Sequence, residues 1–349
     1  MNFYIVQLFI FVLYSFLFFF VNFNYYKIYY WVVCLHLSLI MGLRSINVGT
    51  DTSTNVNDYL VDYTSNTYIY TYNFIKHFCY HFSNGNYHCF LMILSILTVS
   101  LYLYCIYLIQ PSFIDAFLNI YLYITLYYYF SAFNVQRQML AVSLSTLMVI
   151  LIIFKKNIKA LLLFLMAVTV HNTAFITALS VIVVKEKKSK KTLFLTMLFL
   201  ILFITFGNHF FNFFVSIFNH YEIYSKGIYT SSGGNVFYGI FILLFILATL
   251  LTNEGTLRDK KVSSLLYLAS VASVFYIVGA RSTLIIRIAD YFGIFVPMFI
   301  PLSIRYISDK FSNSKLAKMI LYIVVMIITF IIMYYKLSRN MGEIVPYQI

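Results

Sequence analysis

Long apolar stretches alternate with short polar segments along most of the chain. About 20 apolar residues in a helix cross the roughly 30 Å hydrocarbon layer of a bilayer. About ten stretches approach this length, and each predicts a full transmembrane helix. They cover residues 3–21, 29–43, 88–109, 113–131, 137–154, 192–206, 235–252, 262–280, 287–304 and 316–335. The pattern predicts an all-α, polytopic integral membrane protein with a single transmembrane domain over residues 1–349.

One further apolar stretch, 160–184, has a lysine cluster on each side. The clusters are KKNIK (155–159) and KEKKSKK (185–191). Both are predicted to be cytoplasmic, because Lys and Arg are enriched in cytoplasmic loops, and a single crossing would separate them. We therefore expect a short broken or re-entrant helix pair, with HNTA (171–174) near its tip. Broken helices occur at membrane depth where they line a polar cavity.

Composition supports the membrane interpretation and changes the meaning of the charge. Of the 349 residues 62% are hydrophobic and 10% are charged, and the mean hydropathy is +0.86. The net charge of +13 would favour nucleic acid in a soluble protein. Here the basic residues lie in short loops between apolar stretches, where they act as topology signals, so we expect no nucleic-acid partner. The first stretch lacks a basic n-region and a small-residue cleavage site, which predicts an uncleaved anchor.

The same bias predicts orientation. Lys27, both lysine clusters, RDKK (258–261) and the basic group at 305–318 are expected inside. The polar loops 44–87 and 207–234 then face outward and are predicted to form part of a site. Four arginines near helix ends also fall outside: Arg44, Arg137, Arg281 and Arg287.

External arginines are uncommon, and two interpretations stay open. A guanidinium binds phosphate bidentately and stays charged, so the four arginines would form an anion site. Alternatively, each side chain extends to the lipid headgroups. Asn134 and Gln138 accompany Arg137 in FNVQRQ. Asp290 and Tyr291 follow Arg287 at i+3 and i+4, which places all three on one helix face.

Two residues are candidates for a general base. His171 has a side chain that titrates near neutrality, or it caps the carbonyls of the helix break. Asp51 and Thr50 follow Gly49 in what is predicted to be a turn, where the carboxylate acts as a base or orients an arginine. The segment HFCYHFSNGNYHC (77–89) contains three His and two Cys, but its irregular spacing is untypical of zinc sites. We expect no metal and no cofactor.

Five blocks together resemble the EpsG family, the Wzy-type polymerases of bacterial surface polysaccharide. They are GLRSINVGTDTSTNVNDY (42–59), FNVQRQMLA (133–141), HNTAFITAL (171–179), RIADYF (287–292) and VPYQI (345–349). The resemblance implies a bundle of the membrane glycosyltransferase (GT-C) type. Such an enzyme moves a growing glycan from undecaprenyl pyrophosphate to the non-reducing end of a lipid-linked repeat unit, at the outer face of the bacterial cytoplasmic membrane. O-antigen, capsule and exopolysaccharide are all open as products.

The resemblance also assigns expected roles and partners. The four arginines would bind pyrophosphate, His171 or Asp51 would accept the acceptor's proton, and tyrosines within 121–129 would stack on sugars or lie at the membrane interface. Expected partners are the lipid-linked oligosaccharide as donor and acceptor, membrane lipid, a chain-length regulator and a flippase. Two other classes compete. A flippase should carry charges deep in several helices, and an acyltransferase should carry its histidine on the cytosolic side or at mid-membrane.

Overall fold

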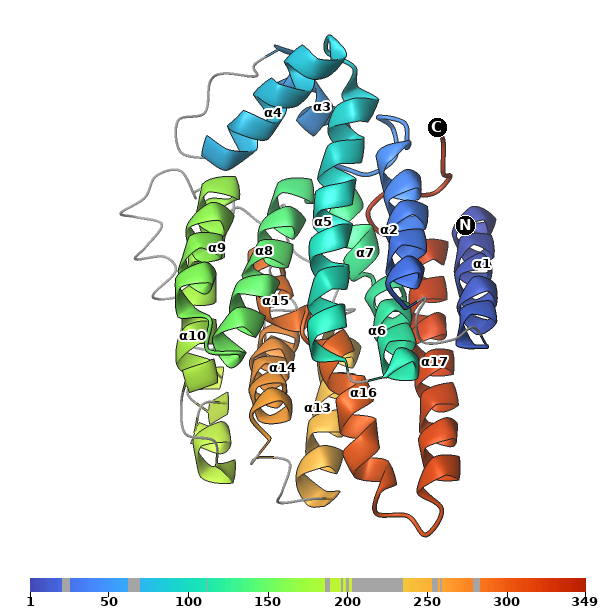
Figure 1. Cartoon of the computed structure of the whole chain (residues 1–349), viewed down its shortest axis with the longest axis vertical. Coiled ribbons are helices and arrows are strands. Elements are labelled where there is room, and N and C mark those ends of the chain that lie inside the picture. Colours follow the sequence, from blue (N-terminus) through green and yellow to red (C-terminus); the bar gives the residue numbers. More distant parts are fainter. Residues whose placement is uncertain are drawn as a thin grey trace. The chain divides into compact units, whose positions relative to one another are not determined.

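The computed structural model is built from helices throughout its described part (Figure 1). It describes residues 1–20, 26–61, 70–110, 112–185, 189–195, 197–198, 201–202, 235–252, 257, 259–278 and 283–349. The chain divides into two compact units, described here separately. Unit 1 is Met1–Phe175 with Tyr322–Ile349, and unit 2 is Ile176–Leu321. The prediction of an all-α polytopic membrane protein is confirmed.

Unit 1 contains most of the long helices. They are α1 (Asn2–Phe19), α2 (Tyr26–Gly42), α3 (Thr52–Val61), α4 (Tyr70–Ser83), α5 (Tyr87–Ile109), α6 (Phe113–Thr125), α7 (Tyr128–Asn134), α8 (Gln136–Ile153), α9 (Asn157–Val170) and most of α17 (Ser314–Ser338). The 3₁₀ turn η2 (Asn172–Thr177) follows α9 at the boundary between the units. Unit 2 contains α10 (Ala178–Lys185), α13 (Asn235–Thr252), α14 (Lys260–Val278), α15 (Thr283–Gly293) and α16 (Val296–Ser308).

Within the described residues, α1, α5, α8 and α17 are long and apolar enough to cross a membrane, and the pair α15–α16 adds a fifth candidate with a 47° bend. Shorter apolar helices are α6, α9, α13 and the segment Asn172–Lys185. Two predicted single spans are wrong in detail. The span 113–131 is interrupted at Tyr127, where φ is +80°, and the span 287–304 is bent between α15 and α16.

The predicted break in 160–184 is confirmed. α9 ends at Val170 and η2 begins at Asn172, so the interruption falls on His171. The return of the second arm to the starting side stays a prediction, as does the single-domain assignment. Most of the predicted span 192–206, all of the loop 207–234 and the residue Arg281 lie outside the described residues.

The core of unit 1 is centred on α5 and α8. α8 is buried along almost its whole length, and α5 packs against α2, α4, α6 and α8. Gly42 permits the close approach of α2, because a Cβ there would lie 2.7 Å from Met92 Cα. The tyrosine-rich stretch 121–129 is also buried, with Tyr123 and Tyr129 1% and 2% exposed. Their side chains are therefore enclosed by protein in this structure and present little surface to lipid or sugar.

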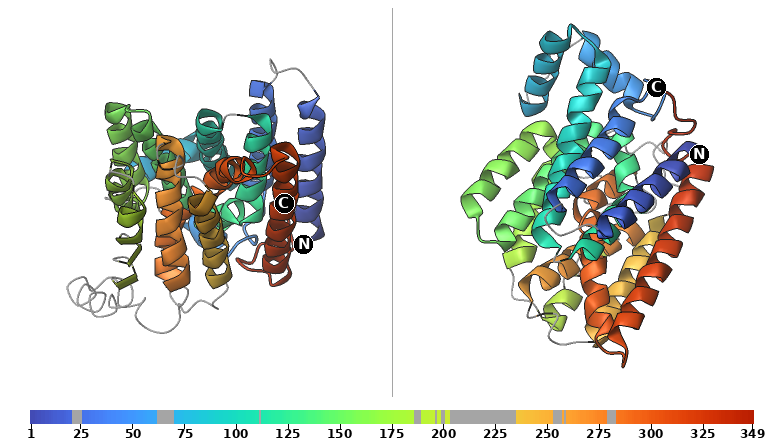
Figure 2. Two further views of the ribbon diagram at one scale, coloured as in Figure 1. Left: turned by 90° about the horizontal axis from the view of Figure 1, so that it is seen from below. Right: turned by 45° about the vertical axis from the view of Figure 1, so that its right-hand side comes forward.

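The C-terminal tail (340–349) is hydrogen-bonded to the loop 43–51, which is distant in sequence. Ser45 N–H donates to Gln348 O (2.8 Å) and Gly49 N–H to Glu343 O (2.9 Å). The Tyr347 hydroxyl donates to Ile40 O at 3.0 Å. The start of α1 joins this arrangement, since Tyr4 donates to Ile344 O (2.9 Å), and both chain ends lie side by side (Figures 1 and 2).

Asn134 is the point where the loop and the tail meet. Its Oδ1 accepts a hydrogen bond from Thr50 N–H at 2.8 Å. A Cβ on Gly49 would lie 2.6 Å from Asn134 Oδ1, and a Cβ on Gly342 would lie 2.3 Å from Asn134 Nδ2. Both glycines also have positive φ, at +103° and +82°. Three segments distant in sequence thus pack around one side-chain amide, and two of them require glycine.

We expect Gly49→Ala to destabilise unit 1 strongly. The change combines a strained backbone, costing about 1–3 kcal/mol, with a clash against Asn134. Gly85→Ala is a matched control, because Gly85 has φ +81° while its Cβ would come no closer than 3.4 Å, to the Tyr80 ring. The measurement is the apparent melting temperature of the purified proteins in detergent. Equal losses in both variants would show that crowding at Asn134 contributes nothing.

Candidate functional site

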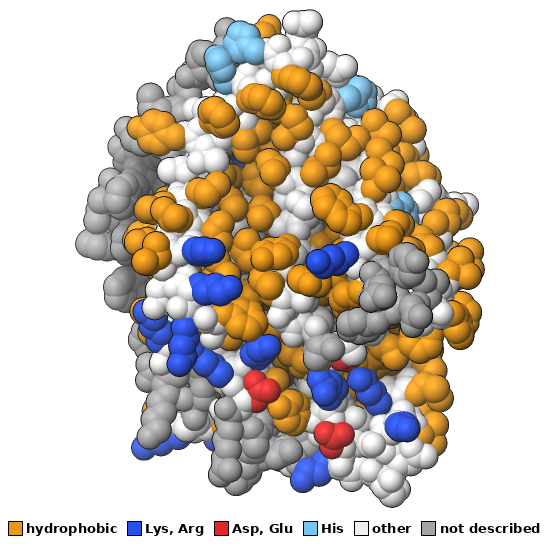
Figure 3. Space-filling view, in the orientation of Figure 1, with side chains coloured by type: hydrophobic (Ala, Val, Ile, Leu, Met, Phe, Trp, Pro, Cys, Tyr) orange, Lys and Arg blue, Asp and Glu red, His pale blue; other side chains and the backbone are white. Residues whose placement is uncertain are grey.

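Several helix ends and two short helices come together at one end of unit 1. α2 and α9 end there, α5 and α8 begin there, and α3 and α4 lie across it (Figures 1 and 2). We call it the α3–α4 end. Histidine side chains gather on its surface (Figure 3). Most of the predicted site residues lie in the segments that form this end.

Arg44 is fully buried at the α3–α4 end. Its guanidinium donates to Met41 O and, at 3.1 Å, to Phe133 O, and it lies 4.9 Å from the centroid of the Phe133 ring. Burial lowers the pKa of Arg44 to about 10, which leaves the group charged at neutral pH. In this arrangement Arg44 joins the end of α2 to α7. Its binding of pyrophosphate stays a prediction and would require displacement of these carbonyls.

Thr50 and Asp51 are positioned by hydrogen bonds between their loop and the end of α7. Besides the bond from Thr50 to Asn134, Thr52 Oγ1 donates to Phe133 O at 3.0 Å. Asp51 is half-buried and immediately precedes α3. A carboxylate is favoured beside a helix N-terminus by the helix dipole. The backbone around Asp51 is therefore fixed from the α7 side.

Arg137 differs from Arg44 because it is only half-buried. It stands in the first turn of α8, and its guanidinium carbon lies 5.4 Å from the centroid of the buried Tyr72 ring of α4. A cation over a ring face is attracted by the ring, and the guanidinium N–H groups that do not face the ring can still bind a ligand. Among the predicted arginines of unit 1, Arg137 is thus the one whose exposure suits ligand contact.

His171 lies at the end of α9 in an extended conformation. Its N–H donates to Ala167 O at 3.0 Å, and its carbonyl accepts from Ala174 N–H at 2.9 Å. The imidazole belongs to a half-buried residue. Two residues earlier, Thr169 Oγ1 is 2.7 Å from Thr71 Oγ1 of α4. The adjacent residues Thr71 and Tyr72 thus connect α4 to the end of α9 and to Arg137.

The two glutamines beside Arg137 are both buried, with Gln136 5% and Gln138 3% exposed. Neither amide atom of Gln136 has a hydrogen-bond partner within the described part of the chain. Leaving such a group unsatisfied costs about 1–3 kcal/mol, so Gln136 is an additional candidate for contact with water or substrate. Gln136 is not among the residues predicted from the sequence, although its place in FNVQRQ beside Arg137 was a signal for it.

The remaining predicted residues belong to unit 2. Arg287, Asp290 and Tyr291 all lie on α15, which confirms their helical spacing. The Tyr276 hydroxyl of α14 donates to Asp290 Oδ1 at 3.0 Å, while Tyr291 is 1% exposed. Arg287 and Arg137 belong to different units, and a site shared by the two stays a prediction.

Among the described residues, no group of three or more His, Cys, Asp or Glu could hold a metal ion. His77 and His81 lie close together on α4, with ring centroids 4.3 Å apart. All four cysteines are free thiols.

Comparison with known proteins identifies the family. A model described as the EpsG family matches residues 27–349, which include the 43–51 loop, the FNVQRQ segment, His171, α15 and the C-terminal tail. No curated protein and no solved structure gives a significant match. Because the match covers nearly the whole chain, this protein belongs to the EpsG family of Wzy-type polysaccharide polymerases.

Proposed function

We propose that the protein transfers a growing glycan from undecaprenyl pyrophosphate to the non-reducing end of a lipid-linked repeat unit, with its site at the α3–α4 end. The observation that carries the proposal is the position of Arg137. Its half-buried guanidinium is stacked on Tyr72 of α4, and the neighbouring Thr71 is bonded to the segment that ends at His171. Consecutive residues of one helix thereby contact the Arg137 cation and the end of α9, which leads into His171.

In the proposed reaction an acceptor hydroxyl attacks the anomeric carbon of the donor glycan. The new glycosidic C–O bond forms as the bond to pyrophosphate breaks, and undecaprenyl pyrophosphate leaves with the electron pair. The hydroxyl proton passes to His171 or Asp51. Arg137 stabilises the negative charge that develops on the leaving pyrophosphate. Arg44 holds the end of α2 and α7 in place, which is a positioning role.

The distribution of charge favours this reaction over transport of polar sugars through the bilayer. In α1, α5, α8 and α17, Asp, Glu, Lys and Arg occur only near helix ends. A flippase needs polar groups along a path through several helices. An enzyme at the interface needs them at one end only. We further propose that the α3–α4 end faces outward, because Lys27, Lys155, Lys156 and Lys159 lie at the opposite ends of α2, α8 and α9.

Deleting the gene should leave surface glycan of one repeat unit, because donor chains can no longer be extended. Gel electrophoresis of the surface glycan should show loss of the ladder of long chains, with recovery on complementation by the wild-type gene. A ladder of normal length in the deletion strain would contradict polymerase activity.

Arg137→Lys should reduce the yield of long chains about tenfold or more, since lysine keeps the charge but loses the paired N–H geometry and hydrogen bonds to charged groups contribute about 1.5–3 kcal/mol. Arg339→Lys is the matched control, because Arg339 is exposed and stacks on Tyr335 at 5.8 Å. Chain lengths are compared on glycan gels at equal amounts of folded protein. Chains of normal length with Arg137→Lys would show that Arg137 does not stabilise the leaving pyrophosphate.

The orientation is tested with two exposed positions of unit 1, Asn47 in the 43–51 loop and Lys156 after α8. In a background without native cysteines, Asn47→Cys should react with a membrane-impermeant thiol reagent in intact cells. Lys156→Cys should react only after the membrane is permeabilised. The reverse pattern would place the α3–α4 end in the cytoplasm.

A further inference from the structure

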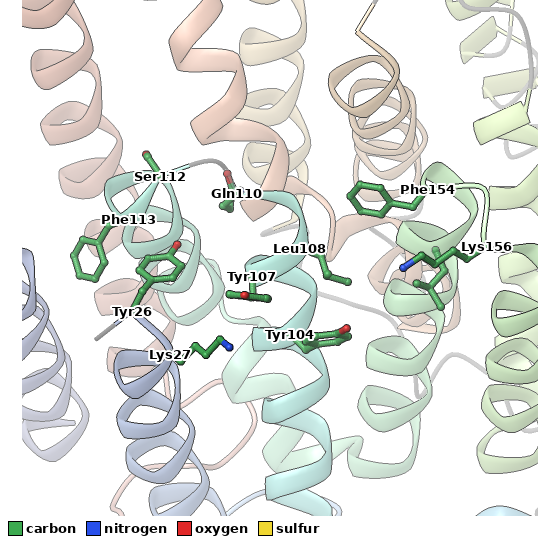
Figure 4. Close-up of a pocket in the computed structure, with 11 residues that line it drawn as sticks. Tyr26, Lys27, Tyr104, Tyr107, Leu108, Gln110, Ser112, Phe113, Phe154 and Lys156 are labelled. Atoms are coloured by element: carbon green, nitrogen blue, oxygen red, sulfur yellow. The ribbon is translucent and has the colours of Figure 1, made fainter. Parts of the chain in front are cut away.

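A hollow of about 730 Å³ opens at the end of unit 1 opposite to α3 and α4 (Figure 4). It lies among the first residues of α2, the last turns of α5, the start of α6 and the segment after α8. Its polar lining comes from Lys27, Tyr104, Tyr107, Gln110, Ser112 and Lys156. We call it the lysine-end hollow. Because α5 has 23 residues and spans about 35 Å, this hollow is remote from Arg137 and His171.

The lysine-end hollow is a cationic environment. Lys27 and Lys156 are exposed and extend toward α5 from opposite sides, flanking Tyr104 and Tyr107 (Figure 4). Among the described residues, those that line it include no Asp or Glu. The buried carboxylate of Asp115, on neighbouring α6, accepts hydrogen bonds from Ser112 and Tyr322. The hollow thus presents two ammonium groups and several hydroxyls, which suits a phosphate ester.

An apolar groove continues from this hollow between α2 and α5. Its volume is about 430 Å³, and it shares Lys27, Tyr104 and Tyr107 with the hollow. The rest of the lining is Tyr30, Trp31, Cys34, Ser100, Leu101 and Leu103. Trp31 is 74% exposed, so the groove opens on the outer surface of the helices. A site that is cationic at one end and apolar along its length matches an amphiphile with an anionic head and a hydrocarbon chain.

We propose that the hollow and groove bind an anionic phospholipid from the leaflet at the lysine end. The phosphate lies near Lys27 and the headgroup extends into the hollow toward Lys156. One acyl chain follows the groove past Trp31. Basic pockets between transmembrane helices bind lipid phosphates in this way, and each lysine near the surface strengthens binding about fivefold. This inference is independent of the proposed polymerase reaction, because it concerns the opposite end of the helices.

Trp31 is the chain's only tryptophan and provides a direct probe. The full-length protein is reconstituted in phosphatidylcholine vesicles containing increasing fractions of phospholipid brominated on its acyl chains, which quenches tryptophan on contact. Brominated phosphatidylglycerol should quench Trp31 at a mole fraction at least about fivefold lower than brominated phosphatidylcholine. Equal quenching by the two lipids would mean unselective contact with surrounding lipid and would overturn the proposal.

Lysine variants test which side chains bind the lipid, and competing phosphates test which molecule occupies the hollow. Lys27→Gln should reduce the preference for phosphatidylglycerol about fivefold, and adding Lys156→Gln should remove most of the remainder. Lys159→Gln is the control, because Lys159 is exposed on α9 but does not line the hollow. Unchanged preference in the double variant would overturn the assignment to these lysines. Relief of quenching by glycerol phosphate would point to a free-phosphate site, and relief by undecaprenyl pyrophosphate to a substrate site; either would replace the phospholipid.

Discussion

Burial of polar backbone at the end of a membrane bundle constrains the whole of unit 1. Arg44, Val48 and Gly49 of the 43–51 loop are buried, so polar backbone groups in this part of the loop need partners inside the protein. Backbone carbonyls of the C-terminal tail accept hydrogen bonds from the N–H groups of Ser45 and Gly49, and the side-chain Oδ1 of Asn134 accepts one from Thr50 N–H. Arg44 in turn satisfies carbonyls of Met41 and Phe133. The tail, Asn134 and Arg44 each form hydrogen bonds with a segment that is distant in sequence. The positions of the 43–51 loop, α7 and the tail therefore depend on one another.

This constraint shows how the loop can position the residues that are proposed as catalytic groups. A reacting carboxylate or imidazole needs a position fixed to a fraction of an ångström, which an unsupported loop does not give. Here the backbone next to Asp51 is fixed through Asn134, and the segment before His171 is fixed through Thr169 and Thr71. The tail and the buried arginine therefore support the proposed site without contacting the groups that are proposed to react. Their effect is preorganisation.

Hydropathy was enough to place α1, α2, α5, α8 and α17 within a few residues, since each is a continuous apolar run. It did not reveal the interruption at Tyr127, because a left-handed residue in a tyrosine-rich run leaves the apolar pattern unchanged. Arg44 and Arg137 looked equivalent in sequence, yet one is enclosed by carbonyls and the other is half-buried over a ring. Their difference arises from contacts with α7 and α4, distant segments that no local pattern encodes.

The two ends of unit 1 use different cations, and their chemistry fits different tasks. At the α3–α4 end, Arg137 has a planar donor group that lies over the Tyr72 ring. A leaving pyrophosphate changes its charge during reaction and requires such defined geometry. At the other end, Lys27 and Lys156 are exposed point charges on flexible chains. A lipid headgroup requires only attraction, because the apolar groove beside Lys27 already sets the depth of its chain. The more precisely positioned cation thus lies at the end where bonds are expected to form and break.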